Sequence, residues 1–292
     1  MISIIPGGNT IIVNCPLYIV NSESIMAVIT KKSGAIEYLV AENIAAPHCF
    51  TTRLGGVSTG IFASLNLNFS RGDDPALVVE NYRRIGRLLG FTPEDVVNAR
   101  QTHSDIVVRV GAENRGKLAV KGASPECDAL ITNTPGMALY VSTADCTPIL
   151  LWDSVTGAVG AAHAGWRGTA SAIGAKTVEA MSREFGTKPE NVRAAIGPNI
   201  GFCHFETDAD VPEAMLEAFG QEVTPFIRKQ GDKYYVNLKE INALVLRRAG
   251  VRDIEISREC TMCQPDRFWS HRVTRGQRGA QGGIIVCKEV RP

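Results

Sequence analysis

Cys146 and His163 are the residues whose types and positions most directly suggest chemistry. Cys146 comes just before the apolar run PILLWD, and His163 lies within the apolar run AVGAAHAG; the turn-like stretch SVTG separates the two runs. Apolar runs joined by such a turn predict a β-hairpin. The cysteine comes just before the first predicted strand, and the histidine comes near the end of the second, 17 positions later. The hairpin therefore predicts that the thiol and the imidazole lie side by side at one open end of a sheet.

His103 is the third candidate, because it lies in RQTHSD, a polar interruption of a strand-like stretch. Two imidazoles and a thiolate are ligands that suit zinc, and three protein ligands leave a fourth position open, as in catalytic zinc sites. Asp145, beside the cysteine, is a candidate acceptor for an imidazole N–H. The spacing of the three ligands is not a zinc signature by itself, so hydrogen-bonded polar side chains without a metal are the alternative.

The stretches around these residues predict clustered strands and a few amphipathic helices. One helix is expected to begin at Asp73 or Asp74, with Pro75 in its first turn, and to end at Gly90. CDALITN and MALYVST are predicted strands that lead into the hairpin, and another helix follows HAGWRG. Because strands and helices do not alternate strictly, we expect a mixed-sheet α+β domain and not a doubly wound one.

Composition limits the partners and the location. The 292 residues include 31 basic and 30 acidic side chains, a net charge of +1, which argues against a nucleic acid partner. The sequence starts without a basic region and has no apolar run long enough to span a membrane, so we expect a cytoplasmic protein without a membrane partner. Residues 1–45 are predicted to form an N-terminal antiparallel β extension, and residues 46–292 the catalytic domain.

The eight cysteines are expected to be thiols, because disulfides are rare in the cytosol. Cys260 and Cys263 form a CxxC, which is half of a zinc ribbon or a redox pair. The sequence contains no second CxxC. Small buried side chains are predicted at Cys15, Cys49 and Cys287, which lie in or beside apolar runs.

A series of motifs in one order carries a family resemblance. TTRLGGVS, SLNL, GDDP, QTHS, TADCTPILL, HAGWRG and IGPNIG closely resemble the motifs of the YfiH-type family, also called the laccase-domain or multicopper polyphenol oxidoreductase family. The resemblance runs from about His48 to the C-terminus. It implies a single α+β domain in which two mixed β-sheets pack between helices.

The same resemblance implies an activity and a cofactor. Its enzymes cleave purine nucleosides (adenosine, inosine, guanosine, methylthioadenosine) with phosphate and also deaminate adenosine. It implies one zinc ion on His103, Cys146 and His163, with water or substrate as the fourth ligand. A bound zinc ion of this kind activates water for deamination.

With a nucleoside and phosphate as expected partners, further polar residues gain predicted roles. Arg53 is expected to bind phosphate and act in catalysis, and Arg167 to bind substrate, because a guanidinium offers phosphate a planar pair of donors. Asn66 is expected to orient the ribose or the base. Asp145 and Glu206 are candidate general acids or bases. For the arginines and the carboxylates, bracing a loop is the alternative.

Three other functions fit parts of the pattern. A cysteine hydrolase acting on an amide or a peptidoglycan precursor would use Cys146 as nucleophile and His163 as base; the family fold resembles that of a toxin deamidase built on Cys and His. A copper-dependent polyphenol oxidase is disfavoured, because five histidines without a His-x-His pair do not supply a multicopper centre. A binding subunit without turnover is the third. We expect a monomer or a homodimer.

Outside the three candidate ligands, His204 is expected to be an ordinary loop residue. His271 lies where the family is expected to have an aromatic residue, which leaves the role of the neighbouring Arg272 open.

Overall fold

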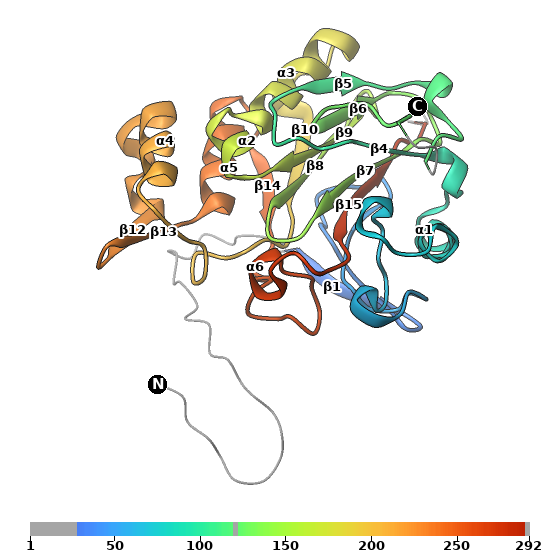
Figure 1. The fold of residues 1–292 in the computed structure, drawn as a ribbon. Helices are drawn as coiled ribbons and strands as arrows, with labels where there is room; N and C mark the ends of the chain where they lie inside the picture. The colour runs from blue at the N-terminus through green and yellow to red at the C-terminus, as the bar shows by residue number, and fades with distance from the viewer. Residues whose placement is uncertain (1–27, 119–121, 290–292) are drawn as a thin grey trace.

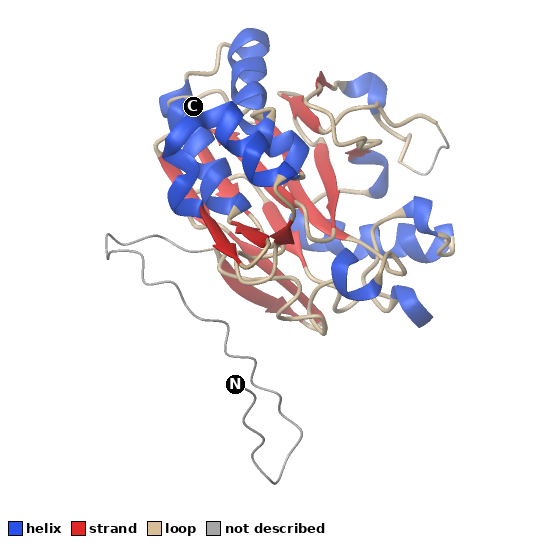
Figure 2. Cartoon of the chain, turned by 60° about the vertical axis from the view of Figure 1, so that its left-hand side comes forward, coloured by secondary structure: helices blue, strands red, loops and turns tan. Residues whose placement is uncertain are grey.

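Two six-stranded β-sheets stack face to face at the centre of the protein, between helices on both outer sides (Figure 1, Figure 2). The computed structural model describes residues 28–118 and 122–289. In spatial order, the first sheet consists of β1 (Ile29–Ser33), β2 (Ile36–Val40), β3 (His48–Thr51), β15 (Gln281–Val286), β7 (Ala138–Thr143) and β4 (Val96–Asn98). The second consists of β14 (Asp253–Ile256), β10 (Val192–Ile196), β8 (Thr147–Asp153), β9 (Val159–Ala164), β6 (Ala129–Thr132) and β5 (Val107–Arg109).

Both sheets are mixed. In the first sheet only β4 and β7 pair in parallel, and in the second β10 pairs with β14 and β5 with β6 in parallel. A third, antiparallel sheet of three short strands lies beside them: β11 (Glu206–Thr207), β13 (Lys233–Val236) and β12 (Ile227–Gln230).

Helices cover the outer faces of both sheets. The α-helices are α1 (Pro75–Leu89), α2 (Trp166–Ala170), α3 (Ile173–Phe185), α4 (Asp210–Phe219), α5 (Leu238–Arg248) and α6 (His271–Thr274). Short 3₁₀ turns are η1 (Gly60–Phe62), η2 (Phe69–Arg71), η3 (Pro93–Asp95), η4 (Ala112–Asn114), η5 (Pro189–Asn191) and η6 (Gly220–Phe226). Figure 1 shows α1 on the side of the first sheet and α3 and α5 on the side of the second.

Three apolar layers hold this arrangement together. Phe50 and Leu139 of the first sheet meet Leu150 of the second in the central layer. Tyr82 of α1 packs in the layer outside the first sheet, and Met181 of α3 in the layer outside the second. Burial of such side chains stabilises a fold by about 1.5–3 kcal/mol each. The expected α+β domain with two mixed sheets between helices is therefore confirmed.

The predicted ends of the first long helix follow from local chemistry. The Asp74 side chain accepts a hydrogen bond from the Ala76 backbone N–H at 2.8 Å and caps α1. Pro75 occupies the first turn, where its missing N–H leaves no intrahelical bond unmade. Gly90 ends the helix with φ of 81°, a left-handed conformation that glycine adopts without steric cost. The sequence prediction of this helix is confirmed.

The strand-like stretch around His103 is divided between the two sheets. β4 lies at the edge of the first sheet and β5 at the edge of the second, so the polar segment between them crosses from one sheet to the other. The segment 144–146 makes a second crossing, from β7 to β8. Both crossings pass the same region, which explains how His103 and Cys146 come together.

The predicted hairpin is present as β8 and β9. Pro148 is paired with His163, and Thr147 with Ala164, so the start of one strand lies beside the end of the other. Cys146 immediately precedes β8, and His163 is the second-last residue of β9. This places the thiol and the imidazole at one end of the hairpin, as expected.

The N-terminal extension is described only in part. β1 and β2 form an antiparallel hairpin, and β2 also pairs with β3 within the first sheet. Residues 1–27, including Cys15, lie outside the described residues, so the extension over 1–45 as a separate unit stays a prediction. Cys49 and Cys287 are buried as expected. Among the residues that the structure describes, no helix has the length and apolarity needed to cross a membrane.

Candidate functional site

His103, Cys146 and His163 form one group of potential metal ligands. One ligand atom from each side chain lies within 4.8 Å of the other two. The imidazole rings of the two histidines are 5.0 Å apart between centroids. His163 is only 4% exposed, whereas Cys146 is half-buried and His103 faces solvent. The group therefore has a buried side and an open side, which suits access by a substrate.

The backbone at two positions of this group adopts a conformation that most residues avoid. His103 has φ of 59°, and Asp145, directly before Cys146, has φ of 85°. Left-handed backbone at a non-glycine residue costs roughly 1–3 kcal/mol. The surrounding hydrogen bonds offset this cost. The Asp128 carboxylate, for example, accepts from the backbone N–H of His103 at 3.1 Å and of Ser104 at 2.7 Å.

Asp128 also sets the orientation of His163. Its Oδ1 lies 2.8 Å from His163 Nδ1, so the imidazole donates Nδ1–H to the carboxylate and turns Nε2 toward Cys146. Burial alone would raise the pKa of Asp128, but hydrogen bonds from His163 and Ser104 outweigh it and lower that pKa. Asp128 performs the role that we predicted for Asp145, and no sequence motif singled it out.

The site favours a positive charge between Cys146 and Asp128. Burial opposes a charged His163, but Cys146 and Asp128 outweigh burial and raise the pKa of His163 to about 9. A proton on the ring or a metal ion bound to it satisfies the same electrostatic demand. Two nitrogens and one sulfur, a fixed imidazole tautomer and a net need for positive charge together fit zinc.

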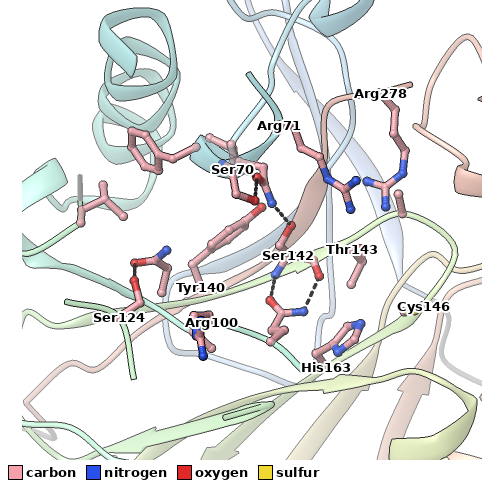
Figure 3. Close-up of a pocket in the computed structure, with 18 of the residues that line it drawn as sticks. Ser70, Arg71, Arg100, Ser124, Tyr140, Ser142, Thr143, Cys146, His163 and Arg278 are labelled. Atoms are coloured by element: carbon pink, nitrogen blue, oxygen red, sulfur yellow. Dashed lines mark hydrogen bonds between the residues drawn. The ribbon is translucent and has the colours of Figure 1, made fainter. Parts of the chain in front are cut away.

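A cavity of about 590 Å³ opens above this group. Figure 3 shows Cys146 and His163 at its floor and the guanidinium groups of Arg71 and Arg278 side by side above them. Its lining consists of Leu67, Asn68, Phe69, Ser70, Arg71, Pro75, Asn98, Ala99, Arg100, Gln101, His103, Leu118, Gly122, Ser124, Tyr140, Ser142, Thr143, Ala144, Cys146, His163 and Arg278. The three predicted metal ligands are among these residues, and the other predicted site residues are not.

Arg71 and Arg278 are the principal residues that the sequence analysis missed. Arg278 is only 8% exposed, and burial together with repulsion from Arg71 lowers its pKa to about 10. Within the described residues, neither guanidinium lies within 4.0 Å of a carboxylate. Two converging cations in a cavity create a strong attraction for an anion. For Arg278 the basic run RGQRGA was the available signal, but a solvated loop has the same pattern.

Asn66 connects the two segments that carry these arginines. Its side chain is fully buried, and its amide oxygen accepts from the backbone N–H of Asn68 at 3.1 Å and of Ala280 at 3.0 Å. Asn68 leads into the turn with Arg71, and Ala280 follows Arg278. Asn66 therefore holds the arginine-bearing segments in register and does not itself line the cavity.

Arg53 uses its guanidinium within the protein. Nε and Nη2 donate to the Ala63 carbonyl at 3.0 and 2.8 Å, and Nη1 donates to the Pro265 carbonyl at 3.0 Å. The group also lies over the Trp269 ring, 5.2 Å from its centroid. This geometry matches the loop-bracing alternative, since it ties the loop after β3 to the segment before α6.

Asp145 lies beside the metal-ligand group but is held by the C-terminal segment. Its carboxylate accepts from the Thr261 hydroxyl at 2.6 Å, the Ser270 hydroxyl at 3.0 Å and the Arg272 backbone N–H at 2.8 Å. These contacts hold the strained backbone that precedes Cys146. They also give Arg272, whose role the sequence left open, a structural role through its backbone N–H.

Arg167 and Glu206 lie outside the cavity lining. Arg167 is exposed at the start of α2 and stacks over the Trp166 ring, 4.2 Å from its centroid. Its charge still acts on the site. The pKa of His103 is lowered mainly by burial and by His163, and Arg167 makes a smaller contribution in the same direction. Glu206 is exposed in β11 and accepts a hydrogen bond from the Tyr235 hydroxyl at 2.9 Å.

Gly165 provides a test of the ligand group that leaves the ligands themselves unchanged. A Cβ at this position would lie 2.6 Å from His103 Nδ1 and 3.4 Å from Cys146 Sγ. Gly165→Ala should therefore displace His103 and lower zinc affinity roughly 10–100-fold, with little change in the thermal midpoint. Gly168→Ala is the matched control, since its Cβ meets no atom closer than 3.4 Å. The zinc affinities of both variants are measured by titration. Equal affinities of Gly165→Ala and Gly168→Ala would contradict the role of His103 as a ligand.

Known proteins resemble this chain in sequence and in structure. The family model described as multi-copper polyphenol oxidoreductase laccase matches residues 47–288. The purine nucleoside phosphorylase of Deinococcus radiodurans is 40% identical over 247 residues, which cover 85% of this chain and 91% of that protein. The purine nucleoside phosphorylase YlmD of Geobacillus stearothermophilus is 38% identical over 244 residues, covering 82% and 89%.

Solved structures agree with these sequence matches. The crystal structure of YlmD from Geobacillus stearothermophilus superposes with a TM-score of 0.84 at 35% identity, covering 90% of this chain and all 100% of that one. The crystal structure of the Bacillus licheniformis hypothetical protein YfiH gives a TM-score of 0.84 at 32% identity, covering 89% and 99%. By sequence, by fold and by the motifs that bring His103, Cys146 and His163 together, the chain belongs to the multi-copper polyphenol oxidoreductase laccase family, in which YfiH and YlmD are relatives.

Proposed function

We propose that this protein is a zinc-dependent purine nucleoside phosphorylase that also deaminates adenosine in the cytoplasm. The observation that carries the proposal is the cavity, in which Arg71 and Arg278 face the His103, Cys146 and His163 group (Figure 3). A volume of about 590 Å³ is in the range of small-molecule sites and accommodates a nucleoside with phosphate. The names of the relatives, purine nucleoside phosphorylases, support this substrate class.

His103, Cys146 and His163 are the residues that would hold the zinc ion. When bound, zinc supplies a Lewis acid and a positive charge beside the substrate. Asp128 keeps the proton of His163 on Nδ1 and thereby keeps Nε2 available as a ligand atom. The ring of His163 is buried, so its orientation is maintained with or without substrate.

Arg71 and Arg278 are proposed to bind the attacking phosphate. Each guanidinium presents planar donors that match two phosphate oxygens, and an anion removes the repulsion between them. In phosphorolysis a phosphate oxygen forms a bond to the anomeric carbon while the bond from that carbon to the purine nitrogen breaks. The purine nitrogen takes up a proton, the hydrogen phosphate gives one up, and ribose 1-phosphate forms. The arginines hold the nucleophile next to the sugar, which lowers the entropic part of the barrier.

Phe69 is proposed to stack on the purine. It lines the cavity, and its ring is stacked on Tyr82 with centroids 5.8 Å apart and planes 6° from parallel. One face of Phe69 is thereby supported from behind, and its other face is available to an aromatic ligand. Phe69 and Arg71 belong to the same 3₁₀ turn, so one rigid element would position both base and phosphate.

Deamination would use the same cavity without the phosphate. Water replaces the amino group on C6 of adenosine, and ammonia and inosine are released. The open side of the metal-ligand group supports this activity, because a catalytic zinc site keeps one position for water or substrate. The general acid or base stays a prediction for Asp145 and Glu206, and the hydrogen bonds of Asp145 favour positioning over proton transfer.

A cysteine hydrolase is the second candidate, and one observation favours it. Cys146 contributes to raising the pKa of His163, an effect that is also typical of a thiolate–imidazolium pair. Such an enzyme would cleave an amide without phosphate and without metal. A multicopper oxidase is disfavoured, because two imidazoles converge on this cavity and the His48 ring is engaged with the Ala41 N–H and the Ala46 carbonyl.

The proposal is tested by incubating the purified protein with inosine or adenosine and measuring the products. We expect hypoxanthine release from inosine to require phosphate, and ammonia release from adenosine to proceed without it. A chelator should abolish both activities, and added zinc should restore them. Amide hydrolysis that survives the chelator would instead establish the cysteine hydrolase, and copper-dependent oxidation of phenols would establish the oxidase.

A further inference from the structure

A second cluster of potential metal ligands lies away from the cavity. It consists of Cys203, His204, Cys260 and Cys263, whose ligand atoms all lie within 4.8 Å of one another. None of the four lines the cavity described above. In the sequence only Cys260 and Cys263 stand out, as a CxxC. Cys203 and His204 are adjacent to each other but lie far from that CxxC along the chain, so no motif connects them to it.

The sheet brings the two halves together. β10 and β14 are parallel neighbours, with Ile196 paired with Ile256, so both strands end at the same edge. The chain after β10 carries Cys203 and His204, and the chain after β14 carries Cys260 and Cys263. A bridge between Asn199 and Cys260 and a backbone hydrogen bond from Thr261 N–H to the Asn199 carbonyl at 2.9 Å keep the two segments aligned.

The distances within the cluster fit a tetrahedral zinc site. Zinc bonds of about 2.3 Å to sulfur and 2.0–2.1 Å to nitrogen place two sulfurs about 3.8 Å apart, and a sulfur and a nitrogen about 3.5 Å apart. The Sγ atoms of Cys203 and Cys263 are 3.6 Å apart. His204 Nδ1 lies 3.2 Å from Cys203 Sγ, 3.3 Å from Cys263 Sγ and 3.6 Å from Cys260 Sγ. One nitrogen in contact with three sulfurs is a metal-ligand arrangement, because a disulfide would involve two sulfurs and no imidazole.

The surroundings favour thiolates. The Gly201 backbone N–H donates to Cys260 Sγ at 3.1 Å, a contact that stabilises a negatively charged sulfur. The buried ammonium of Lys239 donates to the Ser257 and Glu259 carbonyls at 2.7 and 2.6 Å, directly beside Cys260 in the chain. Three thiolates around one zinc ion carry a net charge of −1, and Lys239 supplies the opposite charge.

We propose that Cys203, His204, Cys260 and Cys263 bind a structural zinc ion, separate from the ion at the His103, Cys146 and His163 group. Four protein ligands complete the coordination of zinc and leave no position for a substrate, which is characteristic of structural sites. The ion would clamp the segment after β14 onto the segment after β10. That clamped segment supplies Thr261 and Ser270 to the Asp145 carboxylate, so the clamp also supports the backbone before Cys146.

Metal analysis of the full-length protein and two sets of variants tests the proposal. We expect about two zinc ions per chain in the wild type. Cys203→Ser and Cys263→Ser should each retain about one ion and lose roughly 5–15 °C in thermal midpoint, since bound metal stabilises only the folded state. His103→Ala should also retain about one ion, without that loss in midpoint. Cys287→Ser, which removes a buried thiol outside both groups, is the control and should retain two.

Reconstitution with cobalt keeps the test decisive if a variant does not fold. In the wild type, three thiolates at the second site and one at the first should contribute to the thiolate-to-cobalt absorption. That absorption should be roughly fourfold that of the Cys203→Ser/Cys263→Ser double variant, in which only the thiolate at the first site binds cobalt. If the double variant does not fold, a cobalt protein with a single thiolate ligand serves as the reference. One zinc ion in the wild type, with none lost in Cys203→Ser, would overturn the proposal. So would a Cys203–Cys263 disulfide without a second metal. The proposed function fails separately. If His103→Ala loses one of two zinc ions but the wild type does not cleave nucleosides, the proposed function is contradicted and the proposal of a structural zinc site still holds.

Discussion

Replacing Cys146 by alanine should remove zinc from the cavity and lower phosphorolysis of inosine roughly a thousandfold or more, equivalent to about 4 kcal/mol. The variant leaves His103 and His163 as the remaining protein ligands of that ion. It also removes the thiolate that, together with Asp128, raises the pKa of His163. The measurements are kcat/KM for inosine at saturating phosphate and the zinc content of the same preparation.

Two further variants show whether the thiol acts as a ligand or as a nucleophile. Cys146→Asp offers a carboxylate, which binds zinc but cannot form a thioester. Part of the activity and most of the zinc should therefore remain in Cys146→Asp. Cys287→Ala makes the same chemical change as Cys146→Ala at a buried position outside the cavity and should retain full turnover. Normal zinc content in Cys146→Ala together with complete loss of turnover would favour the cysteine hydrolase.

Replacing Arg278 by alanine should impair phosphorolysis much more than deamination. Losing a charge-assisted contact to phosphate costs on the order of 2–4 kcal/mol, or roughly thirty- to a thousandfold in rate. The protein should still fold, because the change removes a buried charge that Arg71 repels. Arg278→Lys should restore only part of the rate, since an ammonium lacks the planar pair of donors.

Arg53→Ala in the same assay tests the prediction made from the sequence. If Arg53 binds the phosphate, its loss should damage phosphorolysis selectively. Its guanidinium already donates to the Ala63 and Pro265 carbonyls, so we expect lower stability and an equal loss of both activities. Initial rates measured against phosphate concentration, for inosine and adenosine in parallel, distinguish phosphate binding by Arg53 from bracing of the loop. A selective effect of Arg53→Ala with an unchanged phosphate KM in Arg278→Ala would assign the anion to Arg53.

The sequence by itself determined the features that depend on neighbouring residues. The hairpin that brings Cys146 beside His163 follows from two apolar runs and one turn, and the ends of α1 follow from Asp74, Pro75 and Gly90. Such patterns act over a few residues, where backbone geometry and hydrogen bonding leave few alternatives. The order of the motifs added the arrangement of two mixed sheets between helices and the predicted ligand role of His103, which the polarity of its stretch had already marked as a candidate.

Only the tertiary structure decided which distant polar side chains share a site. Arg71 meets Arg278 because Asn66 joins their segments, and Cys203 and His204 meet Cys260 and Cys263 because β10 and β14 are parallel neighbours. Arg53 looks the same as these arginines in the sequence, yet its donors are used by backbone carbonyls. The physical reason is that a guanidinium or a thiol has the same local pattern whether it braces a loop or faces a ligand. Which of the two it does depends on strand pairings between segments far apart in the chain.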